Sequence, residues 1–193
     1  MLTPAEKAEQ LLQLFEQYGQ ADYIGEPVSQ LAHALQCAQL AQHAGADEEL
    51  ILAALLHDVG HLADSANPAL AGAHMDGFGL VDHEMLGAQY LRGLGCSERL
   101  ACLVASHVQA KRYLVYSEPA YAAALSEASR QTLQHQGGPM TAAEAEGFES
   151  DPWFADYIQL RKWDEQAKAT LIDMPALRSF QPMLTLHFEK QTS

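Results

Sequence analysis

The chain has 193 residues, a length typical of a single domain with a substantial apolar core. Its 25 Asp and Glu outnumber its 11 Lys and Arg, and the formal charge of −14 argues against nucleic acids or anionic membranes as partners. No apolar run approaches the roughly 20 residues of a membrane span, and the first residues show no secretory signal. The three cysteines form no CxxC pair, so we expect reduced thiols and a cytoplasmic protein.

Helix signals begin at the first residues of the chain. A threonine N-cap, a proline at the first helical position and a glutamate at the third predict a helix over residues 3–18. Pro27 is expected to begin a second helix, which ends at Gly45. Asp47 is expected to cap a third helix, whose sequence LILAALL is apolar on every side. Because a helix of that kind must be buried, we expect it to lie at the centre of the protein.

The rest of the chain continues the helical pattern. Residues 63–80 are expected to form a loop, because they contain an Asn-Pro pair and three glycines. The segment up to the Gly-Gly-Pro sequence at 137–139 is mixed in character. Further helices are predicted from Asp82 to Gly93 or Gly95, over 97–116, from Thr141, over 151–170 and from Pro175. No stretch alternates apolar and polar residues like a strand, so the predicted fold is all-α, with one domain over residues 1–193.

Histidine is abundant, with nine residues, and four of them recur at regular intervals. The intervals are 24, 26 and 24 residues, about one helix and its return connection. Antiparallel helices would therefore bring these side chains to one level of a helical bundle. The set comprises His33, His57 with the adjoining Asp58, His83 and His107, and Asp164 far downstream. The histidines without this spacing, which we expect at the surface, are His43, His74, His135 and His187.

This set has the chemistry of a buried dinuclear metal site. Asp58 can bridge two ions, because its carboxylate has two oxygens. One ion would be completed by His33, His57 and Asp164, and the other by His83 and His107. Imidazole and carboxylate ligands without thiolate suit iron, manganese or zinc.

The pattern His33…His57-Asp58…Asp164 resembles the HD-domain superfamily of helical metal-dependent enzymes. The additional His83 and His107 match the dinuclear members of that superfamily. Most HD proteins are phosphohydrolases. A minority are mixed-valence diiron oxygenases, such as myo-inositol oxygenase and the phosphonate-cleaving enzymes of the PhnZ and TmpB type.

Two segments near the predicted ligands resemble the phosphonate-cleaving oxygenases. Tyr23 and Glu26 form a YxxE element. The resemblance implies that Tyr23 is a metal ligand that leaves when substrate arrives, and that Glu26 then holds the ammonium group of the substrate. In the sequence HDVGH, His61 stands where many HD proteins have lysine, and it is expected to bind substrate or to orient a metal ligand.

Four further residues match the phosphonate-binding positions of the same enzymes. Lys111 follows a predicted metal ligand by four residues, and Arg161 precedes another by three, so each shares a helix face with a ligand. Ser129 and Thr132 are hydroxyl side chains one helical turn apart. Two cations and two hydroxyl donors suit a phosphonate dianion, and the resemblance implies that these four residues bind it.

The resemblance covers nearly the whole chain and implies an oxidoreductase with two iron ions, Fe(II) and Fe(III), and O2 as co-substrate. The small-molecule substrate would be 1-hydroxy-2-amino- or 1-hydroxy-2-(trimethylammonio)ethylphosphonate. Oxidation of its first carbon would cleave the C–P bond and give glycine or glycine betaine and phosphate. The alternatives are a metal-dependent phosphohydrolase acting on a nucleotide or phosphate monoester, and an HD binding module without activity. The presence of all six expected ligands argues against the binding module.

Overall fold

The computed structural model of the protein describes residues 2–23, 25–67, 82–170 and 173–192. Regular structure in these residues is helical, apart from an isolated antiparallel bridge between Asp22 and Ser29. The predicted all-α class is therefore confirmed. None of the described helices is both long enough and apolar enough to cross a membrane.

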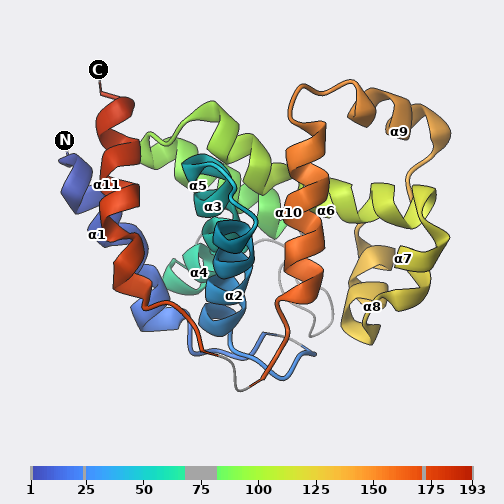
Figure 1. The fold of residues 1–193 in the computed structure, drawn as a ribbon, viewed down its shortest axis with the longest axis horizontal. Helices are drawn as coiled ribbons and strands as arrows, with labels where there is room; N and C mark the ends of the chain where they lie inside the picture. Colours follow the sequence, from blue (N-terminus) through green and yellow to red (C-terminus); the bar gives the residue numbers. More distant parts are fainter. Residues whose placement is uncertain (1, 24, 68–81, 171–172, 193) are drawn as a thin grey trace.

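Figure 1 shows the order and arrangement of the helices. The first half of the chain forms α1 (Pro4–Tyr18), α2 (Gln30–His43), α3 (Glu48–Leu56), α4 (Val59–Ala66) and α5 (His83–Leu94). The second half forms α6 (Glu98–Ser117), α7 (Pro119–Ala124), α8 (Glu127–His135), α9 (Ala142–Glu149), α10 (Phe154–Gln166), the short 3-10 helix η2 (Leu177–Phe180) and α11 (Gln181–Lys190).

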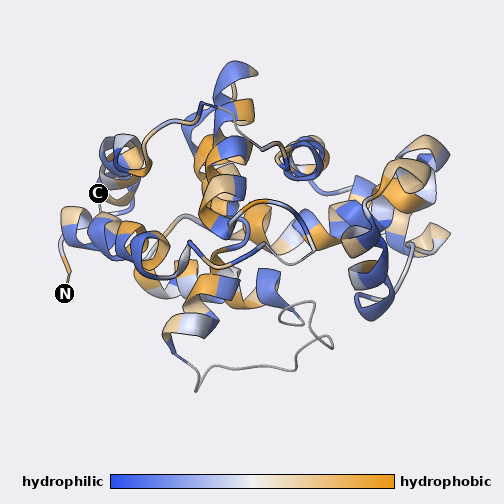
Figure 2. Ribbon diagram, turned by 90° about the horizontal axis from the view of Figure 1, so that it is seen from below, coloured by the Kyte–Doolittle hydropathy of each residue, from blue (hydrophilic) through white to orange (hydrophobic). Residues whose placement is uncertain are grey.

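The helix α3 lies at the centre of the core, as its sequence predicts. Every residue from Leu50 to Leu56 is buried. The helices α2, α6, α10 and α11 all pack against α3. Each buried leucine in this helix contributes about 1.5–3 kcal/mol through removal of apolar surface from water. Figure 2 shows that the apolar residues of the surrounding helices gather toward the interior.

The two ends of the chain meet on one side of the molecule. The helices α1 and α11 lie side by side, with their termini close together (Figure 1). Buried residues of α1 to α6, α10, η2 and α11 belong to one apolar cluster, whereas the buried residues of α8 and α9 lie outside it. The extent of the domain, residues 1–193, stays a prediction, and the continuity of this cluster supports it.

Several predicted boundaries were wrong. The second helix begins at Gln30 rather than at Pro27, because the Ser29 side chain accepts a hydrogen bond from the Ala32 N–H and acts as the N-cap. The helix α4 continues to Ala66, into the segment predicted to be a loop, and residues 68–81 lie outside the described part. The mixed segment before residue 139 contains two helices, α7 and α8, in which only Leu133 is buried. A short helix without an apolar stripe has little signal in the sequence.

The histidines outside the regular spacing were all predicted to lie at the surface, and the structure describes three of the four. His43 and His135 are exposed, as predicted, and His74 lies outside the described residues. His187 is buried, so the prediction of a surface position was wrong. Its Nε2 accepts a hydrogen bond from the Ser97 N–H at 3.2 Å. This contact satisfies the backbone N–H of the residue that caps the start of α6.

Candidate functional site

The six predicted metal ligands converge in the interior, although they come from five different segments of the chain. In the first of two clusters, the Nε2 atoms of His33 and His57 are 3.0 Å apart. The Oδ1 atom of Asp164 lies 3.3 Å from the His33 Nε2 atom. The Oδ2 atom of Asp58 lies 3.1 Å from the His57 Nε2 atom. Two imidazoles and two carboxylate oxygens therefore surround one point.

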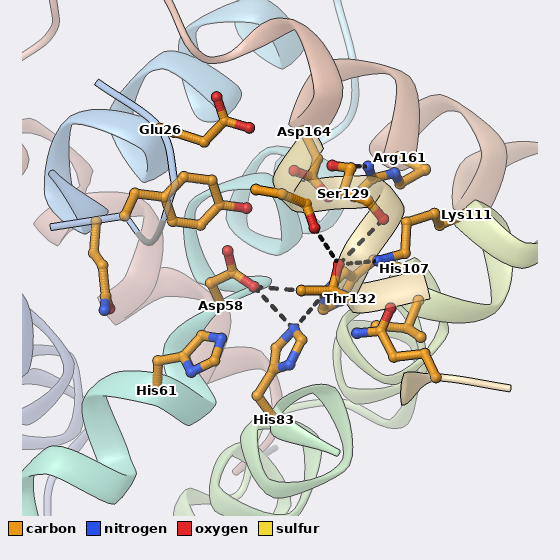
Figure 3. Close-up of a pocket in the computed structure, with 15 residues that line it drawn as sticks. Glu26, Asp58, His61, His83, His107, Lys111, Ser129, Thr132, Arg161 and Asp164 are labelled. Carbon is orange, nitrogen blue, oxygen red and sulfur yellow. Dashed lines mark hydrogen bonds and ion pairs between the residues drawn. The ribbon is translucent and has the colours of Figure 1, made fainter. Parts of the chain in front are cut away.

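The second cluster contains the other two histidines and shares Asp58 with the first. The Nε2 atoms of His83 and His107 are 3.0 Å apart. The Oδ1 atom of Asp58 lies 3.2 Å from the His83 Nε2 and 3.5 Å from the His107 Nε2. The two oxygens of Asp58 thus face different histidine pairs, which is the arrangement of a bridging carboxylate. Figure 3 shows the Asp58 carboxylate directed toward His83 among the residues that line the pocket.

Backbone contacts fix the orientation of three of the imidazoles. The Nδ1 atoms of His33, His57 and His107 lie 2.9, 2.9 and 2.8 Å from the backbone oxygens of Ala167, Ala54 and Val104. A carbonyl oxygen can only accept, so each Nδ1 carries the hydrogen and donates it. In a neutral ring the Nε2 lone pair is then directed into the cluster, as a metal ligand requires.

The residues present fit a pair of metal ions. Asp58 Oδ2 and Asp164 Oδ1 are buried and accept no hydrogen bond, because the Nε2 atoms of His57 and His33 that face them carry no hydrogen when the rings are neutral. Buried carboxylate oxygens without a donor are costly unless a cation neutralises them. Two ligands at right angles, each about 2.1 Å from one ion, lie about 3.0 Å apart, which is the separation of both Nε2 pairs. Both clusters therefore have the donors and the spacing to hold an ion, and the predicted buried dinuclear site is confirmed to this extent.

Charge within the clusters is organised around Asp58. Burial lowers the pKa of His107 to about 3, so this ring is neutral near pH 7. Burial also opposes protonation of His57 and His83, but the Asp58 carboxylate outweighs it and raises the pKa of both rings. The pKa of Asp58 stays well below its ordinary value, because the neighbouring imidazoles outweigh its own burial. Asp58 thus stabilises positive charge on both of its sides.

Local backbone structure explains how Asp58, although adjacent to His57 in the chain, can face both histidine clusters. The chain leaves α3 at His57 and begins α4 at Val59, so Asp58 occupies the break between two helices. At Gly60, a Cβ atom would lie 1.9 Å from the backbone oxygen of His83. The absence of a side chain at Gly60 therefore lets α4 approach the start of α5 and brings His83 to Asp58.

Tyr23, Glu26 and His61 line one side of a pocket above the clusters. The Tyr23 ring stacks on His33, with centroids 3.9 Å apart, and the His61 ring stacks on His83 at 4.2 Å. Burial and the Asp58 carboxylate raise the pKa of Tyr23 well above its ordinary value, so the phenol is protonated in the metal-free protein. Gly25 adopts a φ of 78°, and the turn it allows places Glu26 at the pocket.

Lys111, Ser129, Thr132 and Arg161 line the opposite side of the same pocket (Figure 3). The Lys111 Nζ atom donates to Thr132 Oγ1 at 3.0 Å, and Arg161 Nη2 donates to Ser129 Oγ at 3.5 Å. Both cations are buried. Burial and the nearby Arg161 lower the pKa of Lys111 to about 7. The structure thus brings together all four residues predicted to bind a phosphonate, and that role stays a prediction.

Three neighbours of this group were not predicted. Tyr121 accepts a hydrogen bond from Arg161 Nε at 2.7 Å, and Arg161 also donates to Asp164 and Glu165. Lys168 bonds to Glu165 at 2.9 Å and pairs with Glu26 at 3.0 Å. The i, i+4 spacing of Arg161 and Glu165 on α10 was a signal for an ion pair, and Lys168 lies just beyond the end of that helix. Tyr121 had no such signal, because its segment has no apolar periodicity.

The comparisons with known proteins agree with this architecture. The HD domain model matches residues 31–145, more than half of the chain. The protein therefore belongs to the HD-domain family, as the resemblance predicts.

Several relatives match nearly the whole chain. A 1-hydroxy-2-(trimethylamino)ethylphosphonate dioxygenase (glycine-betaine-forming) of Leisingera caerulea is 38% identical over 177 residues, which are 92% of this chain and 88% of the relative. A hydroxymethylphosphonate dioxygenase of Gimesia maris is 39% identical over 185 residues, covering 92% of this chain and 86% of the relative. An uncharacterized protein of Acanthamoeba polyphaga mimivirus is 38% identical over 183 residues, covering 95% of this chain and 82% of the relative.

Proposed function

We propose that this protein is an iron-dependent dioxygenase that cleaves the C–P bond of a 1-hydroxyphosphonate. The observation that carries the proposal is the bridging position of Asp58, with a different histidine pair facing each oxygen, directly beside the buried Lys111 and Arg161. A dinuclear site next to two cations suits a small anion bound close to two metal ions. The names of the two dioxygenase relatives point to the same class of substrate.

The proposed substrates are 1-hydroxy-2-amino- and 1-hydroxy-2-(trimethylammonio)ethylphosphonate, with glycine or glycine betaine and phosphate as products. One O2 per C–P bond balances the reaction: the hydroxyl-bearing carbon becomes a carboxylate, phosphorus leaves as phosphate and one proton is released. No additional reductant is consumed. An Fe(II)/Fe(III) pair held by the six ligands would supply the oxygen activation that protein side chains lack.

The residues of the chain would bind and orient the substrate. Lys111 and Arg161 would neutralise the phosphonate, and the Ser129 and Thr132 hydroxyls would donate to its oxygens. These contacts hold the C–P bond at a fixed place beside the clusters, which lowers the entropic part of the barrier.

The groups on the other wall would bind the rest of the substrate. Glu26 would pair with its ammonium group. Tyr23 would fill the space of the substrate when the pocket is empty, and His61 would hydrogen-bond the hydroxyl on the first carbon. Because both rings stack on predicted metal ligands, substrate binding at this wall is coupled to the metal clusters.

The test uses protein stripped of metal and reloaded with Fe(II), with phosphate release and O2 consumption measured together. We expect one O2 consumed per phosphate released from a hydroxyphosphonate, and no release without O2. The second candidate is a phosphohydrolase, which the shared H…HD…D residues favour. Phosphate release from a phosphate monoester, without O2 and with manganese or magnesium, would establish that function and refute the oxygenase.

A further inference from the structure

Glu26, the residue proposed to bind the substrate ammonium, already has an ammonium partner in the structure. The Lys168 Nζ atom lies 3.0 Å from Glu26 Oε1. The side chains of Glu26 and Lys168 are only 10% and 14% exposed, so water screens the pair weakly. Lys168 is not among the described residues that line the pocket, so it neutralises part of the Glu26 charge from outside the space that a cationic substrate would occupy.

The backbone around Lys168 is held in place by α2. The Ala167 oxygen accepts from His33 Nδ1 at 2.9 Å. The side-chain amide of Gln36 donates to the Ala169 oxygen and accepts from the Ala169 N–H, both at 3.0 Å. The residues on either side of Lys168 are thus fixed to the same helix that carries a predicted metal ligand. These hydrogen bonds hold the backbone at Lys168 in place and so restrict the positions that its ammonium group can take.

Lys168 also has partners that do not depend on Glu26. Its Nζ atom donates to Glu165 Oε1 at 2.9 Å, to Ser126 Oγ at 3.2 Å and to Ser129 Oγ at 3.4 Å. Glu26 can therefore exchange Lys168 for another cation without leaving a buried ammonium unpaired. The exchange is possible, but the repulsion between Lys168 and the incoming cation opposes it.

We propose that Lys168 is a specificity-determining residue: by pairing with Glu26 it weakens the binding of cationic substrates, and so reduces the preference for them over hydroxyphosphonates that lack an ammonium group. This inference rests on the proposed function. The relatives include one protein named for a trimethylamino substrate and one named for hydroxymethylphosphonate. Proteins with similar identity to this chain, 38% and 39%, are thus named for substrates with and without an ammonium group. In the described residues, Tyr23 is the one Phe, Tyr or Trp side chain that lines the pocket, and no aromatic cage assists Glu26 there.

The experiment compares two substrates with the iron-loaded enzyme in air. The measured quantity is the ratio of kcat/KM for 1-hydroxy-2-(trimethylammonio)ethylphosphonate to kcat/KM for hydroxymethylphosphonate. Both substrates share the hydroxyphosphonate and differ in the trimethylammoniomethyl group, so the change in this ratio between variants reports how each residue affects binding of that group. We expect Lys168→Met to raise this ratio about tenfold, through a lower KM for the cationic substrate with little change in its kcat.

Three further variants establish the cause. Lys162→Met removes an ammonium of α10 that pairs with Glu118 rather than with Glu26, so it should leave the ratio unchanged. Glu26→Gln should lower the ratio. Adding Lys168→Met to Glu26→Gln should then raise the ratio by less than Lys168→Met does alone, because only the direct repulsion of the cation by Lys168 is left to remove. Lys168→Gln, which keeps a donor toward Glu165, replaces Lys168→Met if the latter fails to fold.

The outcomes separate this inference from the proposed function. An unchanged ratio in Lys168→Met or its replacement, or a full rise in the double variant, would overturn the role of Lys168 while the oxygenase activity stands. Absence of O2-dependent phosphate release from both substrates in the wild-type enzyme would overturn the proposed function, and the inference with it.

Discussion

The replacement of Lys111 by methionine is expected to stabilise the metal-free protein and to weaken the enzyme. Lys111 is 4% exposed, and among the described residues its side-chain partner is the Thr132 hydroxyl. Burial lowers its pKa from 10.5 to about 7. At about 1.4 kcal/mol per pKa unit, holding the proton on this buried amine costs about 5 kcal/mol in acid and about 4 kcal/mol at pH 7.

Methionine is similar in length and carries no charge. It loses the hydrogen bond to Thr132, worth about 1 kcal/mol, while the Thr132 hydroxyl keeps the Ala128 oxygen as a partner at 3.1 Å. The net gain in the free energy of unfolding at pH 7 is then about 3 kcal/mol. For a chain of this size that corresponds to a rise in Tm of about 6–12 °C.

The pH dependence gives an independent check. The unfolded chain keeps the Lys111 proton up to its ordinary pKa of 10.5, whereas the folded protein releases it near pH 7. The unfolded state therefore binds more protons between these values, and wild-type stability rises with pH, by about 2 kcal/mol from pH 7 to pH 9. Lys111→Met should lack this contribution, so its advantage over the wild type shrinks as the pH rises.

The assay is thermal unfolding of chelator-treated protein, followed by circular dichroism from pH 6 to pH 9. Lys162→Met is the matched control, because its ammonium is 39% exposed and pairs with Glu118 at the surface. We expect this control to stay within about 0.5 kcal/mol of the wild type. In the iron-loaded enzyme, Lys111→Met should lose about 10- to 100-fold in kcat/KM. A lower Tm for Lys111→Met, or the same pH slope as the wild type, would refute the reasoning.

Two further predictions, each with a control variant, concern the metal site and the packing of the helices beside it. Asp58→Ala should reduce bound metal from two ions to at most one per chain, measured by elemental analysis, because each carboxylate oxygen faces its own histidine pair. The control Asp156→Ala, which removes a partner of Arg99, should keep both ions. Two bound ions in Asp58→Ala would contradict the bridging position. Gly60→Ala should lower the free energy of unfolding by about 3 kcal/mol, because the new Cβ atom clashes with the backbone of His83. In the control Gly93→Ala the new Cβ atom has no atom near it, so the free energy of unfolding should rise by about 0.5–1 kcal/mol. Equal stability of the two variants would refute the packing argument.

Much of the fold could be predicted from local sequence. The N-caps at Thr3, Asp47 and Ser97 begin helices where expected, because a capping side chain and the first helical turn are neighbours in the chain. The apolar sequence of α3 predicted its central position for a similar reason, since a helix without a polar face has to be buried. The helices α7 and α8 were missed, because segments of six and nine residues are too short for an apolar periodicity to stand out in the sequence.

The sequence by itself determined which residue types recur at helical intervals: the four histidines, the two aspartates and the cations on the same helix faces. Spacing could suggest that they converge, because a repeat of one helix and one connection returns the chain to the same level. Only the tertiary structure decided the direction of each side chain. The two-sided position of Asp58 depends on a break between helices, and the pairing of Glu26 with Lys168 joins segments far apart in the chain. Such contacts arise from packing between helices, and no local pattern encodes them.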